Sequence, residues 1–192
     1  MKLWLVRHAR PLIEHGICYG ATDMAADVQA TQASAQALAR VLPQGVRVMT
    51  SPLQRCTQLA KALQALRPDL PATPDARLAE MNFGCWEGVR WDAIPQDDYA
   101  HWMDNFSTCR FGGRESVGEF MQRVALARAD AEVGAQETVW ITHAGVARAM
   151  SLLVQSVMRV ERADQWPKAT PEWGQWWERA VYWLKPVSVS SA

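Results

Sequence analysis

The chain has 192 residues, a length that fits one domain with a sizeable hydrophobic core. Twenty lysines and arginines balance twenty aspartates and glutamates, so no overall electrostatic field favours nucleic acid or an anionic membrane surface. We therefore expect neither as a partner, and any anion-binding site must be local.

Cysteine usage and apolar stretches favour a cytoplasmic protein. The four cysteines are scattered, with no C-x-x-C pair and no histidine at zinc-ligand spacing, which predicts reduced thiols. The apolar run before Arg7 is too short for the apolar segment of a signal peptide. The most apolar later stretch, residues 139–158, contains His143 and Arg148, so we expect no membrane span.

The N-terminal part of the chain predicts a strand, a loop and a helix. Residues 3–6 form a short apolar run typical of a buried β-strand, and Pro11 prevents its simple continuation in a sheet. Residues 12–27 are rich in turn formers and are expected to form a loop. Apolar residues at helical spacing then predict a helix over residues 28–42, which Pro43 ends.

The next segment predicts two more strands. Residues 46–50 are expected to form the second strand, followed by a helix with Ser51 at its cap and Pro52 at its first position. A third short strand is predicted near residues 72–75. Residues 77–90 have no clean period and contain two glycines, so we interpret them as a functional loop.

The second half of the chain begins with an irregular helical segment. Residues 91–106 are interpreted as part of a cap over a site. Ser116 and Glu119 have the spacing of a capping box and open a helix that ends at Gly134. A buried strand over residues 138–142 follows. The core stripe of the next helix is expected to consist of Val146, Ala149, Met150, Leu153 and Val157.

The C-terminal region is rich in tryptophan. Residues 180–184 are predicted to form a last strand, and the tail from Ser188 is expected to fray. Core packing or a homodimer contact is the interpretation for Trp173, Trp176, Trp177 and Trp183. Strands that alternate with helices predict one α/β domain over residues 1–192, a three-layer α/β/α sandwich with a mostly parallel central sheet.

Three of the predicted strands lead into residues of related chemistry. The first ends in Arg7 and His8, the second runs into a helix with Arg55 in its first turn, and the strand over residues 138–142 ends at His143. Because the carboxyl ends of parallel strands meet at one edge of a sheet, these four side chains are expected to converge. Two helix N-termini add backbone N–H groups. This combination predicts a dianion pocket, and two guanidiniums favour phosphate.

The remaining catalytic options are narrowed by what the sequence lacks. It has no Walker-type glycine-rich loop, no G-x-S-x-G elbow and no obvious carboxylate cluster for a metal ion, and no cofactor or metal site is predicted. A histidine nucleophile or base in a phosphate pocket remains, kept unprotonated by neighbouring arginines. Glu80, in the predicted functional loop, is the best-placed proton donor.

These residues fall in segments that resemble, in order and over nearly the whole chain, those of the histidine phosphatase (phosphoglycerate mutase-like) superfamily. The segments are residues 5–8, 51–55, 80–88, 112–116 and 142–145. An arginine–histidine pair alone is a weak signal, but the ordered set is a strong one. Within the superfamily, residues 18–23 and 83–88 most resemble alpha-ribazole phosphatase-like members of cobalamin biosynthesis.

The resemblance implies a role for each candidate residue. His8 would be the phosphorylated nucleophile, while Arg7, Arg55 and His143 would hold the phosphoryl oxygens. Glu80 would act first as general acid and then as base for the attacking water.

The chain departs from the family pattern directly after the nucleophile. The superfamily usually has R-H-G-E, whereas this chain has Ala9 and Arg10 after His8. Ala9 adds a methyl group where glycine would permit a closer backbone approach or a positive φ. Arg10 is expected to contact phosphate or substrate, or else to form a surface ion pair. Thr22, in the loop that resembles the alpha-ribazole phosphatase-like members, is the other candidate substrate contact.

The sequence therefore predicts a metal-independent phosphomonoesterase of the histidine acid phosphatase type, acting on a small-molecule phosphate ester through a phosphohistidine. Alpha-ribazole 5′-phosphate is the substrate that the resemblance favours. A phosphoglycerate mutase-type phosphotransferase, a broad phosphatase and a catalytically inactive phosphate-binding module remain alternatives. The short C-terminus leaves little sequence to close over the site, which counts against the mutase, and the complete residue set counts against the inactive module.

Overall fold

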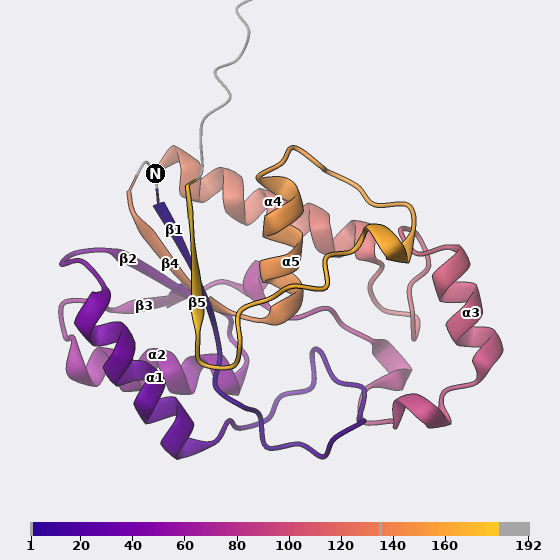
Figure 1. The fold of residues 1–192 in the computed structure, drawn as a ribbon, viewed down its shortest axis with the longest axis horizontal. Coiled ribbons are helices and arrows are strands. Elements are labelled where there is room, and N and C mark those ends of the chain that lie inside the picture. The colour runs from indigo at the N-terminus through magenta and orange to yellow at the C-terminus, as the bar shows by residue number, and fades with distance from the viewer. Residues whose placement is uncertain (1, 135, 181–192) are drawn as a thin grey trace, which may run out of the picture.

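The structure, a computed structural model, describes residues 2–134 and 136–180. These residues build a five-stranded sheet with the order β3-β2-β4-β1-β5 (Figure 1). The first four strands run parallel, and β5 pairs antiparallel with β1. Their bounds are β1 (Lys2–Arg7), β2 (Arg47–Thr50), β3 (Ala72–Pro74), β4 (Thr138–Thr142) and β5 (Trp176–Ala180).

Helices cover both faces of this sheet, which confirms the predicted three-layer α/β/α sandwich (Figure 1). Alternate residues of β1 supply the two cores: Leu3 and Leu5 pack towards one face, while Trp4 and Val6 pack towards the other. A strand buried on both sides requires apolar residues at every position, which explains the unbroken apolar run. The covering helices are α1 (Val28–Val41) and α2 (Gln54–Leu66) on one face, and α4 (Val117–Val133) and α5 (Ala144–Leu153) on the other.

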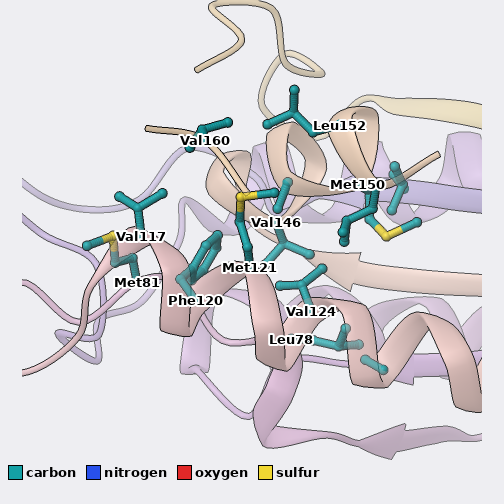
Figure 2. Close-up of a cluster of buried hydrophobic side chains, with 14 of the residues drawn as sticks. Leu78, Met81, Val117, Phe120, Met121, Val124, Val146, Met150, Leu152 and Val160 are labelled. Carbon is teal, nitrogen blue, oxygen red and sulfur yellow. The ribbon is translucent and has the colours of Figure 1, made fainter. Parts of the chain in front are cut away.

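The larger core lies between α4, α5 and the sheet. Figure 2 shows Phe120, Met121 and Val124 of α4 in the same buried cluster as Val146 and Met150 of α5. All five side chains are fully buried. This packing fixes α5, and with it the helix N-terminus that follows β4.

The N-terminus of α4 has the capping box that the sequence predicts. The Ser116 hydroxyl accepts the backbone N–H of Glu119 at 3.2 Å, and the Glu119 carboxylate accepts the backbone N–H of Ser116 at 2.9 Å. A cap of this kind typically stabilises a helix by about 1 kcal/mol.

The predicted cap of α2 is wrong. The helix begins at Gln54, its N-cap is Leu53, and no side chain caps it. Ser51 instead extends the sheet, because its backbone N–H donates to the carbonyl of Ile141 at 2.9 Å. Its hydroxyl lies 2.8 Å from Nε2 of His143, so the residue serves the site at the strand edge.

Two further boundaries differ from the sequence prediction. Helix α5 ends at Leu153, and Ser156 adopts a left-handed φ of 63°, so Val157 leaves the core stripe and is 37% exposed. The last described strand is Trp176–Ala180 rather than residues 180–184, of which 181–184 lie outside the described residues. The predicted frayed tail also lies outside them.

The segment predicted as an irregular cap lies beyond one end of the sheet (Figure 1). It consists of a 3₁₀ turn (Trp91–Ala93) and the short helix α3 (Gln96–Asp104). No helix among the described residues is long and apolar enough to cross a membrane.

Candidate active site

The carboxyl ends of β1, β2 and β4 lie side by side, as the topology predicts. Arg7 is in register with Thr142, and the backbone N–H of His8 donates to the carbonyl of Thr142 at 3.1 Å. A cavity of about 590 Å³ opens at this edge. Its polar end is lined by Arg7, His8, Arg55, Glu80 and Gly145.

His8 lies at this end as a buried, neutral imidazole. Its Nδ1 lies 2.7 Å from the carbonyl oxygen of Ala9, and because a carbonyl only accepts, we place the proton on Nδ1. Burial, followed by the charges of Arg55 and Arg7, lowers the pKa of His8 to about 3 against the opposing effect of the Ala9 carbonyl. The lone pair of Nε2 is thus available as a nucleophile at neutral pH.

Arg55 is fully buried beside this nitrogen. Its Nε–H donates to Nε2 of His8 at 3.3 Å, which is a long hydrogen bond that an incoming phosphoryl group can replace. The two terminal nitrogens donate to backbone carbonyls, Nη1 to Thr22 at 2.8 Å and Nη2 to Gly20 at 2.5 Å.

Arg7 places a second guanidinium on the cavity wall. Its Nη1 donates to the carbonyl of Pro171 at 3.1 Å, and its guanidinium carbon lies 5.1 Å from the ring centre of Trp173. Its Nε is buried and has no hydrogen-bond partner within the described structure. Burial lowers the pKa of Arg7, as expected for a cation held in a partly dehydrated pocket.

His143 lies behind His8 and is only 1% exposed. The two ring centres are 5.1 Å apart, and Nε2 of His143 lies 2.8 Å from the Ser51 hydroxyl and 3.5 Å from the Cys56 sulfur. Burial, with the charge of Arg55 next, lowers the pKa of His143 well below its ordinary value. In this arrangement His143 is neutral and supports the base of the pocket.

Glu80 faces the same cavity from the loop that precedes Gly84. One carboxylate oxygen accepts the backbone N–H of Gly145 at 3.0 Å, at the start of α5, and the other accepts the N–H of Met81 at 3.1 Å. The positive end of α5 therefore holds the carboxylate in place. Glu80 therefore lies in the same cavity as His8, and its role as proton donor stays a prediction.

Arg10 and Thr22, the two predicted substrate contacts, lie elsewhere. Arg10 is exposed, and its guanidinium carbon lies 5.9 Å from the ring centre of Trp173, next to a separate surface depression. The Thr22 hydroxyl donates to the carboxylate of Glu87, which turns it away from the substrate role that we predicted. Its backbone carbonyl instead holds Arg55.

The departure at position 9 is accommodated without strain. Ser156 is the one non-glycine residue with a positive φ in the described part of the chain, so Ala9 has no conformation that requires glycine. Its methyl group is buried, and its carbonyl carries the hydrogen bond that orients His8.

Aromatic side chains form much of the remaining cavity lining. Trp102 and Phe106 are 9% and 5% exposed, belong to the packed core and also line the cavity. Trp86 packs against the core instead, 6.0 Å from the ring centre of Phe111. The other aromatic residues of the lining are Tyr19, Phe83, Trp91, Tyr99, Phe120 and Trp166.

Sequence reasoning missed several charged residues at this site, among them Asp164 and Lys168 of the cavity lining. Arg148, one turn after Gly145 on α5, lines the cavity. Glu87 binds the loop of residues 20–22, whose backbone carbonyls accept hydrogen bonds from Arg55. Because Glu87 lies in the motif over residues 83–88, the sequence did carry a signal that this residue contributes to the site. Within residues 2–134 and 136–180, no group of three or more histidine, cysteine, aspartate or glutamate residues is arranged to hold a metal ion.

Comparison with known proteins decides the family. The model of the histidine phosphatase superfamily (branch 1) matches residues 3–173. The chain belongs to this superfamily. Its members' common sequence pattern thus accounts for nearly all of the described chain.

Solved structures agree on the fold. The alpha-ribazole phosphatase from Shigella flexneri has a TM-score of 0.78 at 22% identity, covering 93% of this chain and 89% of its own. A mycobacterial glucosyl-3-phosphoglycerate phosphatase in complex with inorganic phosphate has a TM-score of 0.74 at 22% identity, covering 92% and 88%. A search of curated protein sequences finds no match to this chain.

Proposed function

We propose that this protein is a metal-independent phosphomonoesterase that works through a phosphohistidine at His8. The observation that carries the proposal is a neutral, buried His8 that lines the same cavity as Arg7, Arg55 and Glu80. Membership of the histidine phosphatase superfamily supports the same reaction class.

In the first chemical step, Nε2 of His8 attacks phosphorus and the bond to the leaving oxygen breaks. Arg7 and Arg55 balance the charge of the phosphoryl oxygens, while neutral His143 packs behind His8. Glu80 gives its proton to the leaving oxygen. The proton stays on Nδ1 of His8, and its hydrogen bond to the Ala9 carbonyl stabilises the charged imidazole that forms.

In the second step, a water molecule replaces the leaving group. Glu80, now a carboxylate, takes a proton from the water while its oxygen attacks phosphorus. The phosphorus–nitrogen bond breaks, inorganic phosphate leaves, and the lone pair returns to Nε2 of His8. Glu80 thereby regains the proton that it gave to the leaving oxygen.

The aromatic lining of the cavity supports a substrate whose leaving group carries a flat ring. Trp102 and Phe106 are among the aromatic residues that line the same cavity as His8, where a ring can stack on them. We therefore propose alpha-ribazole 5′-phosphate, a phosphate ester of a benzimidazole riboside, as the substrate to test first. The likeness to alpha-ribazole phosphatase structures supports this choice at the level of the fold.

The experiment is phosphate release from p-nitrophenyl phosphate and from alpha-ribazole 5′-phosphate, in the presence of EDTA. We expect the wild-type protein to release phosphate from both, with the higher kcat/KM on the riboside. His8→Ala should reduce kcat by more than about 10³-fold. His15→Ala, which replaces an exposed histidine, is the matched control and should keep wild-type activity.

Three results would contradict the proposal. Loss of activity in EDTA, restored by a divalent cation, would show that a metal ion takes part. Full activity of His8→Ala would show that another group is the nucleophile. A protein that moves phosphate between sugar acids without releasing it would be a mutase instead.

A further inference from the structure

Arg55 carries a full positive charge inside the protein without a carboxylate at ion-pair distance among the described residues. An isolated buried charge is costly, so its partners decide whether it stays in place. Two of those partners are the backbone carbonyls of Gly20 and Thr22. Arg55 therefore keeps its position only if these two carbonyls are held towards its guanidinium.

Glu87 binds the opposite side of the same loop. Its carboxylate accepts the backbone N–H groups of Gly20 at 2.9 Å, Ala21 at 2.9 Å and Thr22 at 3.0 Å, and also the Thr22 hydroxyl. A further backbone N–H, that of Phe83, donates at 2.9 Å. The Glu87 carboxylate thus accepts five hydrogen bonds, and the residue is half-buried.

One peptide group connects the two charges directly. The peptide between Gly20 and Ala21 offers its C=O to Arg55 and its N–H to Glu87. In a trans peptide these two groups point in opposite directions, so its dipole lies between the cation and the anion with the favourable sign at each end. The charges of Arg55 and Glu87 are therefore coupled through this peptide group rather than by direct contact.

The ionisation of Glu87 agrees with this arrangement. Burial alone would raise its pKa, but the hydrogen bond from Thr22 and those from the backbone of Gly20, Phe83 and Ala21 outweigh it. The pKa of Glu87 is therefore lowered, and the group is an anion at neutral pH.

The loop of residues 20–22 is packed too closely to adopt a different position. A Cβ atom at Gly20 would lie 1.8 Å from the Met81 carbonyl oxygen and 2.9 Å from the Phe83 ring, so this residue packs directly on the loop that carries Glu80. Anchored by Glu87 and packed against its neighbour, the loop presents its carbonyls at a fixed place.

We propose that Glu87 is a positioning residue for phosphate binding: through the backbone of residues 20–22 it holds Arg55 beside Nε2 of His8, ready for the phosphoryl oxygens. The inference rests on the proposed function, because the task of Arg55 is to hold the phosphoryl group. Glu87 itself touches no reacting atom.

Inorganic phosphate, titrated calorimetrically into the folded protein, measures this role without turnover. Glu87→Gln puts an amide N–H₂ against backbone N–H donors and removes the charge. We expect it to weaken phosphate binding by about 10–100-fold, a size typical of groups that orient a binding residue. Glu87→Asp keeps the charge and should recover part of the loss.

Glu119→Gln is the matched control. Glu119 also accepts a backbone N–H, that of Ser116, and its pKa is also lowered, to about 2, but it caps α4 away from the His8 pocket. Its variant should lose stability and keep the wild-type phosphate affinity. Thermal unfolding of each variant shows whether a loss of affinity comes from a loss of fold.

A double-mutant cycle separates positioning from a general structural effect. If Glu87 acts through Arg55, then Glu87→Gln should weaken phosphate binding little further in a protein that already carries Arg55→Gln. Two losses that multiply would contradict the inference. Arg55→Lys keeps a cation in the same place and is the second variant if Arg55→Gln does not fold.

The outcomes separate the two proposals. A wild-type protein that neither binds phosphate nor hydrolyses an ester contradicts the proposed function. A wild-type protein that does both, with Glu87→Gln binding phosphate equally well, contradicts the positioning role alone.

Discussion

His8 lies between a hydrogen bond that orients it and a buried cation, and burial together with the charge of that cation keeps it unprotonated. The Ala9 carbonyl fixes the proton on Nδ1, while Arg55 lies 3.3 Å from Nε2. Since Arg55 is itself held by loop carbonyls, the imidazole and guanidinium keep a set distance before substrate arrives. Preorganisation of this kind reduces the rearrangement that the reaction needs.

Gly145 provides a test at the scale of one residue. A Cβ at this position would lie 2.1 Å from a carboxylate oxygen of Glu80, so Gly145→Ala should push the carboxylate out of place. The helix itself should tolerate or favour alanine. We expect wild-type stability with kcat lower by at least about 10²-fold, the usual contribution of a general acid, in a steady-state assay with a thermal unfolding scan.

Gly134→Ala is the control for this change. Gly134 ends α4, and a Cβ there would meet its nearest neighbour at an ordinary 3.5 Å. It should keep full activity. Full activity of Gly145→Ala would mean that Glu80 does not need its present position.

Among the elements, the cap formed by α3 and the turn before it is the one that shapes the substrate end. Trp102 of α3 stacks on Phe111 with ring centres 4.3 Å apart, and its indole also lines the cavity. The rigid pair therefore gives the cavity a flat wall.

Trp102→Ala should change selectivity more than catalysis. We expect kcat/KM to fall about tenfold for an ester with an aromatic leaving group, the size of a lost aromatic contact, and less for glycerol phosphate. Trp86→Ala, which removes an indole that packs behind the wall, is the control. It should reduce kcat/KM for both substrates by the same factor. Equal losses of kcat/KM for the two esters in Trp102→Ala would contradict an aromatic subsite.

The elements that were predicted well are those whose signal is local. The capping box of α4 and the apolar runs of β1 and β4 follow from spacing and composition alone. Ser51 misled the prediction because its hydroxyl bonds to His143, far away in sequence, instead of capping α2. The end of α5 depends on a left-handed Ser156, for which the sequence carries no glycine as a signal.

For the site, the strand topology was enough to predict that the candidate residues lie close together, but not how their side chains are oriented. Parallel strands place Arg7, His8 and His143 at one edge, and Arg55 follows in the first helical turn. The inward turn of Thr22 was not predictable, because it depends on a carboxylate 65 residues away. Long-range hydrogen bonds of this kind leave no pattern in a single sequence.

The whole molecule should lose stability in acid because it buries two neutral histidines. The pKa of His8 is lowered to about 3 and that of His143 well below its ordinary value. As pH falls below about 6.5, the unfolded chain takes up protons that the folded protein does not, so stability falls with pH down to the folded pKa values. We expect a loss on the order of a few kcal/mol between pH 7 and pH 4.

Urea unfolding at a series of pH values measures this loss. The slope of unfolding free energy against pH should become smaller in His8→Gln. His15→Gln, which replaces an exposed side chain, should leave the slope unchanged. An unchanged slope in His8→Gln would show that His8 takes up its proton equally well in the folded protein.

The most direct test of the central proposal is to trap the phosphoenzyme. Rapid mixing with a labelled phosphate ester, a quench in alkali and peptide mapping would locate any phosphoryl group, and phosphohistidine survives alkali but not acid. We predict an acid-labile phosphoryl group on the peptide that contains His8, formed and lost at least as fast as turnover. Turnover with no such intermediate, or with the phosphoryl group on another residue, would contradict a mechanism through His8.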